Sequence, residues 1–237
     1  MAYVEGNPED RAGKTMLKHA GFIAIITFTI MGLLLIGSDD WKSELYRNLV
    51  IGGVVLFVSV IVSLKLNPLG WKKVFRRSEY ERLLKSEKLV IDELSKLDDN
   101  YFVINDFSFE LFHVEHLVVS DKGMFVISKN PYAGELNVAN GALYSGDQSL
   151  DSVTSSLWRV CHLINIIIRK GFNNLEIMPK PVLVLPEESK SKMKDFNGIA
   201  VAGIDELNGL ITSRIRFSIE REHAEGFAVF IKQRYLN

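Results

Sequence analysis

A chain of 237 residues with 47% hydrophobic residues can bury a sizeable core, either as one domain or as a domain with an appendage. Its formal net charge of -1 excludes a strong overall attraction to nucleic acid, so any phosphate-binding surface would have to be local. The only cysteine, Cys161, excludes an intrachain disulfide and favours a reducing compartment.

Two uncharged, apolar stretches occupy the N-terminal third of the chain, at residues 20–37 and 49–64. Each is close to the ~20 residues that a helix needs to cross a hydrocarbon core. A cleaved signal peptide is disfavoured, because a second apolar stretch follows almost at once. The pattern therefore predicts a two-helix transmembrane hairpin over residues 16–66.

The basic residues around these stretches predict how the hairpin is oriented. Lysines and arginines are more frequent after the second stretch than in the loop between the two, which places both termini in the cytoplasm of a cell with a bacterial-type inner membrane. Residues 1–15 are predicted to be a flexible cytoplasmic arm, and residues 67–77 a basic linker. The linker charge is best explained by anionic headgroups, with nucleic-acid phosphate as the alternative. The membrane-proximal basic residues are Lys65, Lys72, Lys73, Arg76 and Arg77.

The rest of the chain, residues 78–237, is predicted to form one α/β domain. Its hydrophobic periodicity predicts a helix, a set of antiparallel strands, a helix that buries Cys161, two buried strands and a closing helix. This order predicts a mixed β-sheet flanked by helices. The helices are expected at 78–97, 151–170, 205–210 and 218–235, and the strands at 101–104, 107–120, 124–129, 132–144, 181–186 and 199–202.

A hairpin with a tight turn at residues 121–123 is the centre of this domain, and polar residues lie at its far end. A further acid, Glu87, lies on the apolar face of the first helix, where an unpaired carboxylate is costly. We expect the two histidines of the hairpin to make ordinary hydrogen bonds, because their spacing does not suit a metal. The polar residues are His113, Glu115 and His116 on one strand and Ser128, Lys129 and Asn130 on the other.

Over residues 79–204 the chain resembles the nuclease-related domain (NERD) family, which is similar in fold to restriction-endonuclease-like nucleases. The resemblance is carried by Val114-Glu115-His116-Leu117-Val118-Val119, Gly123-Met124-Phe125-Val126-Ile127, Tyr132-x-Gly134 and Ser86-Glu87. It implies a magnesium site built from a helix glutamate, a strand aspartate and a Glu-x-Lys pattern. The matching positions here are Glu87, Glu115, Ser128 and Asn130.

Two of these positions depart from the family pattern. Ser128 brings no negative charge to a metal, and Asn130 can neither supply a cation nor take a proton. Lys129 is an alternative cation, but strand alternation places it on the opposite side from its two neighbours. The two acids can therefore form either a metal site or an inherited polar pocket in which they pair with histidines, Lys129 or backbone groups.

These observations favour a membrane-anchored, catalytically inactive nuclease-like domain that serves as an interaction or nucleic-acid-associated module. Its expected partners are the membrane, other membrane proteins or nucleic acid, and it needs no cofactor. One alternative is a magnesium-dependent nuclease with rearranged ligands, using Glu87 and Glu115 with Glu110 or Glu135, and Lys129 as its cation. Another is a structural subunit of a membrane protein complex. The sequence leaves the oligomeric state open.

Overall fold

The computed structural model describes residues 1–6, 50–58, 61, 77–109, 112–171, 177–186, 189, 191–213 and 219–236, with isolated positions between 21 and 30. The chain forms two compact units. One unit consists of residues 1–7 and 86–237, and the other of residues 8–85. The first unit contains every strand of the structure.

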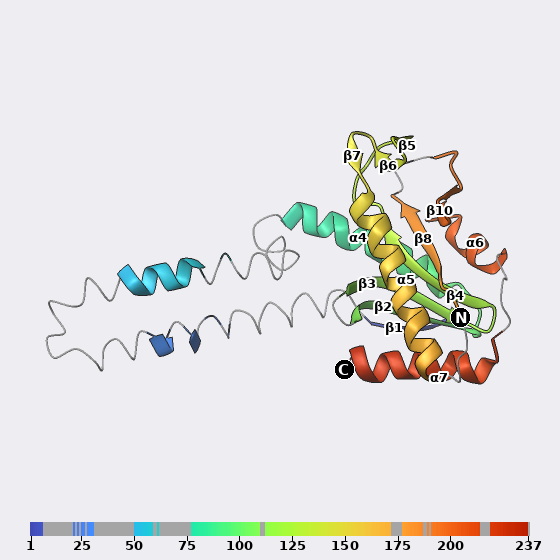
Figure 1. The fold of residues 1–237 in the computed structure, drawn as a ribbon, viewed down its shortest axis with the longest axis horizontal. Coiled ribbons are helices and arrows are strands. Elements are labelled where there is room, and N and C mark those ends of the chain that lie inside the picture. Colours follow the sequence, from blue (N-terminus) through green and yellow to red (C-terminus); the bar gives the residue numbers. More distant parts are fainter. Residues whose placement is uncertain are drawn as a thin grey trace, which may run out of the picture. The chain divides into compact units, whose positions relative to one another are not determined.

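A seven-stranded mixed sheet forms the centre of this unit (Figure 1). Strands β2 and β4 both pair antiparallel with β3, whereas β4, β8 and β10 run parallel. In spatial order the strands are β1 (Tyr3–Glu5), β2 (Tyr101–Phe109), β3 (Phe112–Ser120), β4 (Gly123–Lys129), β8 (Lys180–Leu185), β10 (Ile199–Gly203) and β9 (Asp195–Phe196). A small second sheet comprises β5 (Leu136–Ala139), β6 (Ala142–Ser145) and β7 (Gln148–Ser149).

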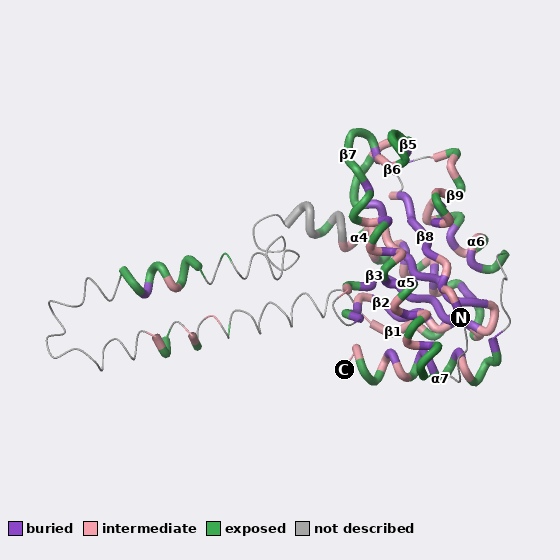
Figure 2. The backbone as a smooth tube through the Cα atoms, in the orientation of Figure 1, coloured by how far each residue is buried: buried purple, intermediate pink, exposed green. Residues whose placement is uncertain are grey.

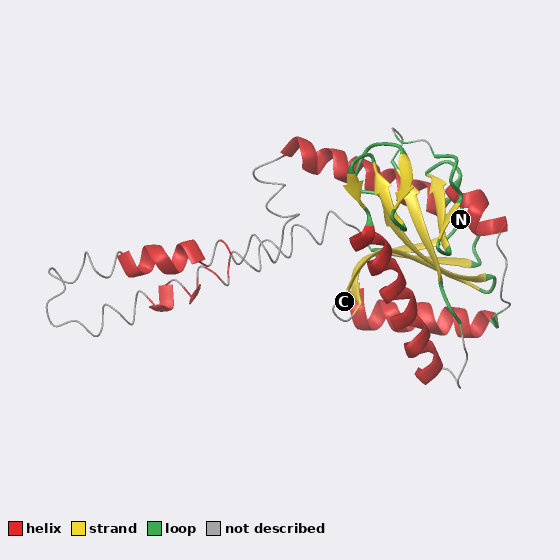
Figure 3. Ribbon diagram, turned by 45° about the horizontal axis from the view of Figure 1, so that its top comes forward, coloured by secondary structure: helices red, strands yellow, loops and turns green. Residues whose placement is uncertain are grey.

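Helices cover both faces of the large sheet, so the predicted mixed sheet flanked by helices is present (Figure 3). Helices α4 (Arg77–Ser95) and α6 (Leu207–Ser213) contribute to one hydrophobic core. Helices α5 (Asp151–Gly171) and α7 (Arg221–Ile231) contribute to the other, and a π-helical turn, η1 (Lys232–Leu236), follows α7. Successive residues of β4 enter opposite cores, which explains why that strand is apolar without a break.

The predicted hairpin is confirmed. Strands β3 and β4 pair in antiparallel register, with Val118 opposite Phe125 and Ser120 opposite Gly123. Cys161 is fully buried on α5, and burial raises the pKa of its thiol, so it is a core residue as expected.

The prediction of a flexible arm is wrong for its first residues, because Tyr3–Glu5 forms strand β1. This strand pairs in parallel with β2, with Tyr3 opposite Phe102, and Glu5 accepts a hydrogen bond from the Lys232 ammonium at 2.6 Å. Three residues are too few to show an alternating pattern, and their partner strand lies about a hundred residues away in the sequence. The domain therefore also includes β1, which the predicted boundary at residue 78 left out, while residues 7–15 lie outside the described residues.

The predicted transmembrane hairpin is also wrong as a feature of this structure. Most of residues 16–66, and residues 67–76 of the predicted linker, lie outside the described residues, and Arg77 begins α4. In the part of the chain that is described, no helix has both the length and the apolar character needed to cross a membrane. Helices α4 and α5 have 19 and 21 residues and are long enough, but both have charged residues along their exposed sides.

Gly6 ends the N-terminal strand in a conformation that a larger residue cannot adopt there. Its φ angle is +88°, and a Cβ atom would lie 2.1 Å from the Asn105 carbonyl oxygen. We expect Gly6→Ala to lower the free energy of unfolding by about 1–3 kcal/mol, through backbone strain and displacement of β1. Urea unfolding measures this. Gly209→Ala in α6 is the control, because a Cβ there meets nothing within 4 Å; equal losses in both variants would contradict the proposed packing of Gly6.

Candidate functional site

A shared irregularity in β2 and β3 places polar residues against α4. Ile104 and Phe107 enter the same core although they are three residues apart, and the same is true of Val114 and Leu117. The regular alternation of side chains between the two faces of the sheet is therefore interrupted in both strands, at positions that lie opposite each other. At this irregularity Asp106 has a positive φ angle of 49°. Two fully buried polar residues, Asn105 and His116, face each other next to it.

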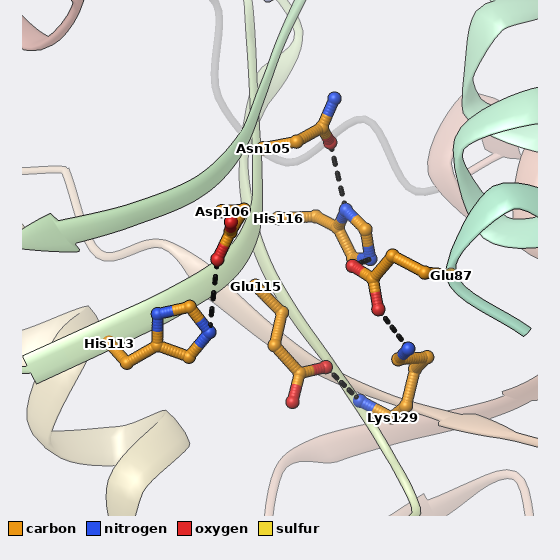
Figure 4. Close-up of polar contacts among 7 residues, drawn as sticks. All are labelled: Glu87, Asn105, Asp106, His113, Glu115, His116 and Lys129. Atoms are coloured by element: carbon orange, nitrogen blue, oxygen red, sulfur yellow. Dashed lines mark hydrogen bonds and ion pairs between the residues drawn. The ribbon is translucent and has the colours of Figure 1, made fainter. Parts of the chain in front are cut away.

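The central contact joins α4 to β4. The ammonium of Lys129 forms an ion pair with one carboxylate oxygen of Glu87, and the Nε2 atom of His116 lies 3.2 Å from the other (Figure 4). The side chains of Glu87 and Lys129 are only 13% and 15% exposed, and His116 is fully buried. A helix acid is thus held between a cation and an imidazole from two neighbouring strands.

His116 is neutral at physiological pH. Burial lowers its pKa to about 4, and the nearby Glu87 carboxylate opposes this shift only in part. Its Nδ1 atom lies 2.8 Å from the Asn105 side chain, while its Nε2 lacks hydrogen-bond geometry toward Glu87. The Asn105 atom in this contact is the amide oxygen, which can only accept, so the Nδ1–H of His116 donates to it and Nε2 carries the lone pair.

Glu115 differs sharply from Glu87 in its surroundings. One of its oxygens accepts the backbone N–H of Lys129 at 2.7 Å, and the Ser128 hydroxyl also hydrogen-bonds to it. Burial raises its pKa to about 7; the charge of Lys129 lowers it and that of Glu87 raises it. The carboxyl of Glu115 is therefore partly protonated at neutral pH, although the residue keeps some exposure to solvent.

In the structure Glu87, Glu115, Ser128 and Lys129 lie together, but the Asn130 side chain is hydrogen-bonded elsewhere. The Asn130 side chain donates to the Ser145 hydroxyl at 2.9 Å and accepts the Tyr132 backbone N–H at 3.0 Å. It therefore holds the chain where β4 leaves the sheet. His113 lies apart from the cluster, 3.6 Å from Asp106.

A magnesium ion does not fit this arrangement. The Lys129 ammonium already neutralises Glu87, and Glu115 accepts a backbone N–H and binds its proton unusually tightly. Among the residues that the structure describes, no group of three histidine, cysteine, aspartate or glutamate side chains is placed to hold a metal. Glu135 is exposed and does not join the two acids, and Glu110 lies outside the described residues.

Sequence reasoning missed Asn105, which contacts His116 from β2. The available signal was an Asn-Asp pair inside an otherwise aromatic and β-branched strand, where polar residues need a buried partner. Comparison with known proteins adds no further assignment: no family model, no curated protein and no solved structure matches this chain. The likeness to the nuclease-related family stays a prediction from the residues quoted above.

Proposed function

We propose that the unit built on the seven-stranded sheet is a catalytically inactive, nuclease-like module that acts by binding rather than by cutting. The observation that carries this proposal is the ion pair between Lys129 and Glu87. In a metal-dependent nuclease, carboxylates hold the metal against the phosphate and a lysine acts on water or on developing charge. Here the lysine neutralises the acid itself.

The neighbouring groups support the same conclusion. Ser128 provides a neutral hydroxyl, which is a weak ligand for a divalent cation compared with a carboxylate. Glu115 is held by the backbone N–H of Lys129 and has a raised pKa. A divalent cation would have to displace a tethered ammonium and a proton before it could bind, and both displacements cost free energy.

A cleavage assay with the full chain tests this proposal. We expect no cutting of single- or double-stranded DNA or RNA with Mg²⁺ or Mn²⁺ above that in a metal-free control. Glu87→Gln is expected to leave this background unchanged, because Glu87 has a structural partner instead of a metal. Metal-dependent cutting that disappears in Glu87→Gln would overturn the proposal.

A further inference from the structure

The outer face of α5 carries a compact group of basic side chains. Its inner face contributes Leu157, Val160, Cys161, Ile164 and Ile168 to a hydrophobic core. At 100° per residue, the positions on the outer side fall within an arc of roughly 100°, so they share one surface. This α5 basic face consists of the exposed residues Arg159, His162, Arg169 and Lys170, with exposed Ile166 among them.

The charge of this face is concentrated and unneutralised. After Asp151, at its first position, α5 contains no acidic residue. Among the described residues, no carboxylate forms an ion pair with Arg159, Arg169 or Lys170. Residues 77–237 contain 19 lysines and arginines against 23 aspartates and glutamates, a net charge of -4. A cationic face on a domain of net negative charge favours an anionic partner at that face.

Two aromatic rings lie at one end of the α5 basic face. Trp158 and His162 are adjacent on the helix, with ring centroids 5.8 Å apart and an interplanar angle of 34°. Trp158 is partly buried, and its ring packs near Gly198, where a Cβ atom would lie 3.1 Å away. Packing against Gly198 therefore holds the tryptophan ring in place, while the His162 side chain is exposed. Figure 2 shows exposed positions along helix α5. A supported ring beside an arginine can stack a nucleobase.

We propose that the α5 basic face binds single-stranded nucleic acid. The cations run along about 16 Å of helix, from Arg159 to Lys170, and so reach successive phosphates of one strand. Arginine suits phosphate because its guanidinium can form two parallel hydrogen bonds. The Trp158–His162 pair distinguishes this partner from an anionic lipid surface, which offers no bases to stack. The inference rests on the proposed function, since it names the partner class of a binding module.

Fluorescence anisotropy with the full chain tests the inference. The probe is a labelled oligouridine longer than the roughly 4–16 nucleotides covered by a single-strand-binding fold. We expect binding to weaken with salt, with a slope of log K against log salt near about -2 for three neutralised phosphates. Arg159→Glu/Arg169→Glu is expected to weaken binding by at least about tenfold at low salt.

The matched control is Lys85→Glu/Lys192→Glu, which makes the same change in net charge at exposed positions outside α5. It is expected to leave the affinity within about twofold, because only local charges contact the strand. Arg159→Gln/Arg169→Gln repeats the test without adding acids to the end of a helix, and circular dichroism checks that each variant folds. Equal losses in the α5 and control variants would overturn the inference.

Two further measurements separate the alternatives. His162→Ala is expected to weaken oligouridine binding several-fold, since it removes the exposed ring of the pair. Vesicles containing phosphatidylserine are expected not to bind; binding to vesicles without binding to oligouridine would assign the face to a membrane surface and overturn the inference. The cleavage assay is independent: cutting that depends on Glu87 would remove the proposed function and leave the binding result standing.

Discussion

Replacing Lys129 with methionine is expected to lower the free energy of unfolding by about 3–5 kcal/mol. The variant removes the cation from Glu87, whose side chain is 13% exposed and has only the neutral His116 beside it. A largely buried carboxylate without a cation loses hydration that no other contact restores. Urea unfolding, followed by circular dichroism, measures the change.

Two further variants show whether the ion pair is responsible. Glu87→Gln/Lys129→Met removes both charges and is expected to recover most of the lost stability, since an uncharged pair leaves no isolated ion in the core. Lys96→Met breaks an ion pair with Glu93 in which the lysine is 63% exposed, and should cost no more than about 1 kcal/mol. Similar losses for Lys129→Met and Lys96→Met would mean that the central pair is solvated.

Glu115→Gln and His116→Gln are expected to reveal two opposing effects of pH on stability. The pKa of Glu115 is raised by burial from 4.5 to about 7, so the folded state binds the proton more tightly than the unfolded state. Its contribution is fully present below pH 4.5 and is lost as the pH rises to about 7. His116 acts in the opposite sense: burial lowers its pKa from 6.5 to about 4, so its contribution is present above pH 6.5 and is lost as the pH falls.

Each shift is worth about 3 kcal/mol across its window, at about 1.4 kcal/mol per pKa unit. Because the windows overlap, the two effects largely cancel in the unmodified chain between pH 4.5 and 6.5. Glu115→Gln should therefore make stability rise with pH over this range, and His116→Gln should make it fall. Denaturant unfolding at a series of pH values measures both slopes, and parallel profiles for the two variants would contradict these pKa shifts.

The parts of the fold that the sequence predicted are those with strong local signals. The hairpin between Val118 and Phe125 combines apolar strands with a short polar turn, and its pairing follows from the turn itself. Helix α5 shows a long apolar stripe from Leu157 to Ile168, so its buried face could be read from periodicity. Strand β8 contains the continuous apolar run from Val182 to Leu185 between Pro181 and Pro186, as a strand covered on both faces should.

The candidate site was harder to predict because it depends on which face each residue occupies. Strand alternation correctly places Lys129 and Ser128 on opposite faces of the sheet, but it does not say which of the two faces Glu87 packs against. In the structure Lys129 lies on the same side as Ile127, against α4 and therefore against Glu87. The change of face near Asp106 is a backbone irregularity that regular strand periodicity cannot anticipate.

The pairing of β1 with β2 also has a consequence for how this domain folds during translation. Glu5 of β1 is paired with Ile104 of β2, so the ribosome must add about a hundred residues after Glu5 before the two strands can meet. At about 5–20 residues per second, this delay lasts about 5–20 s. The ion pair between Lys232 and Glu5 can form only after nearly all of the described chain has been made. Strand β1 therefore reaches its final contacts later than the hairpin of β3 and β4, whose strands follow each other directly in the chain.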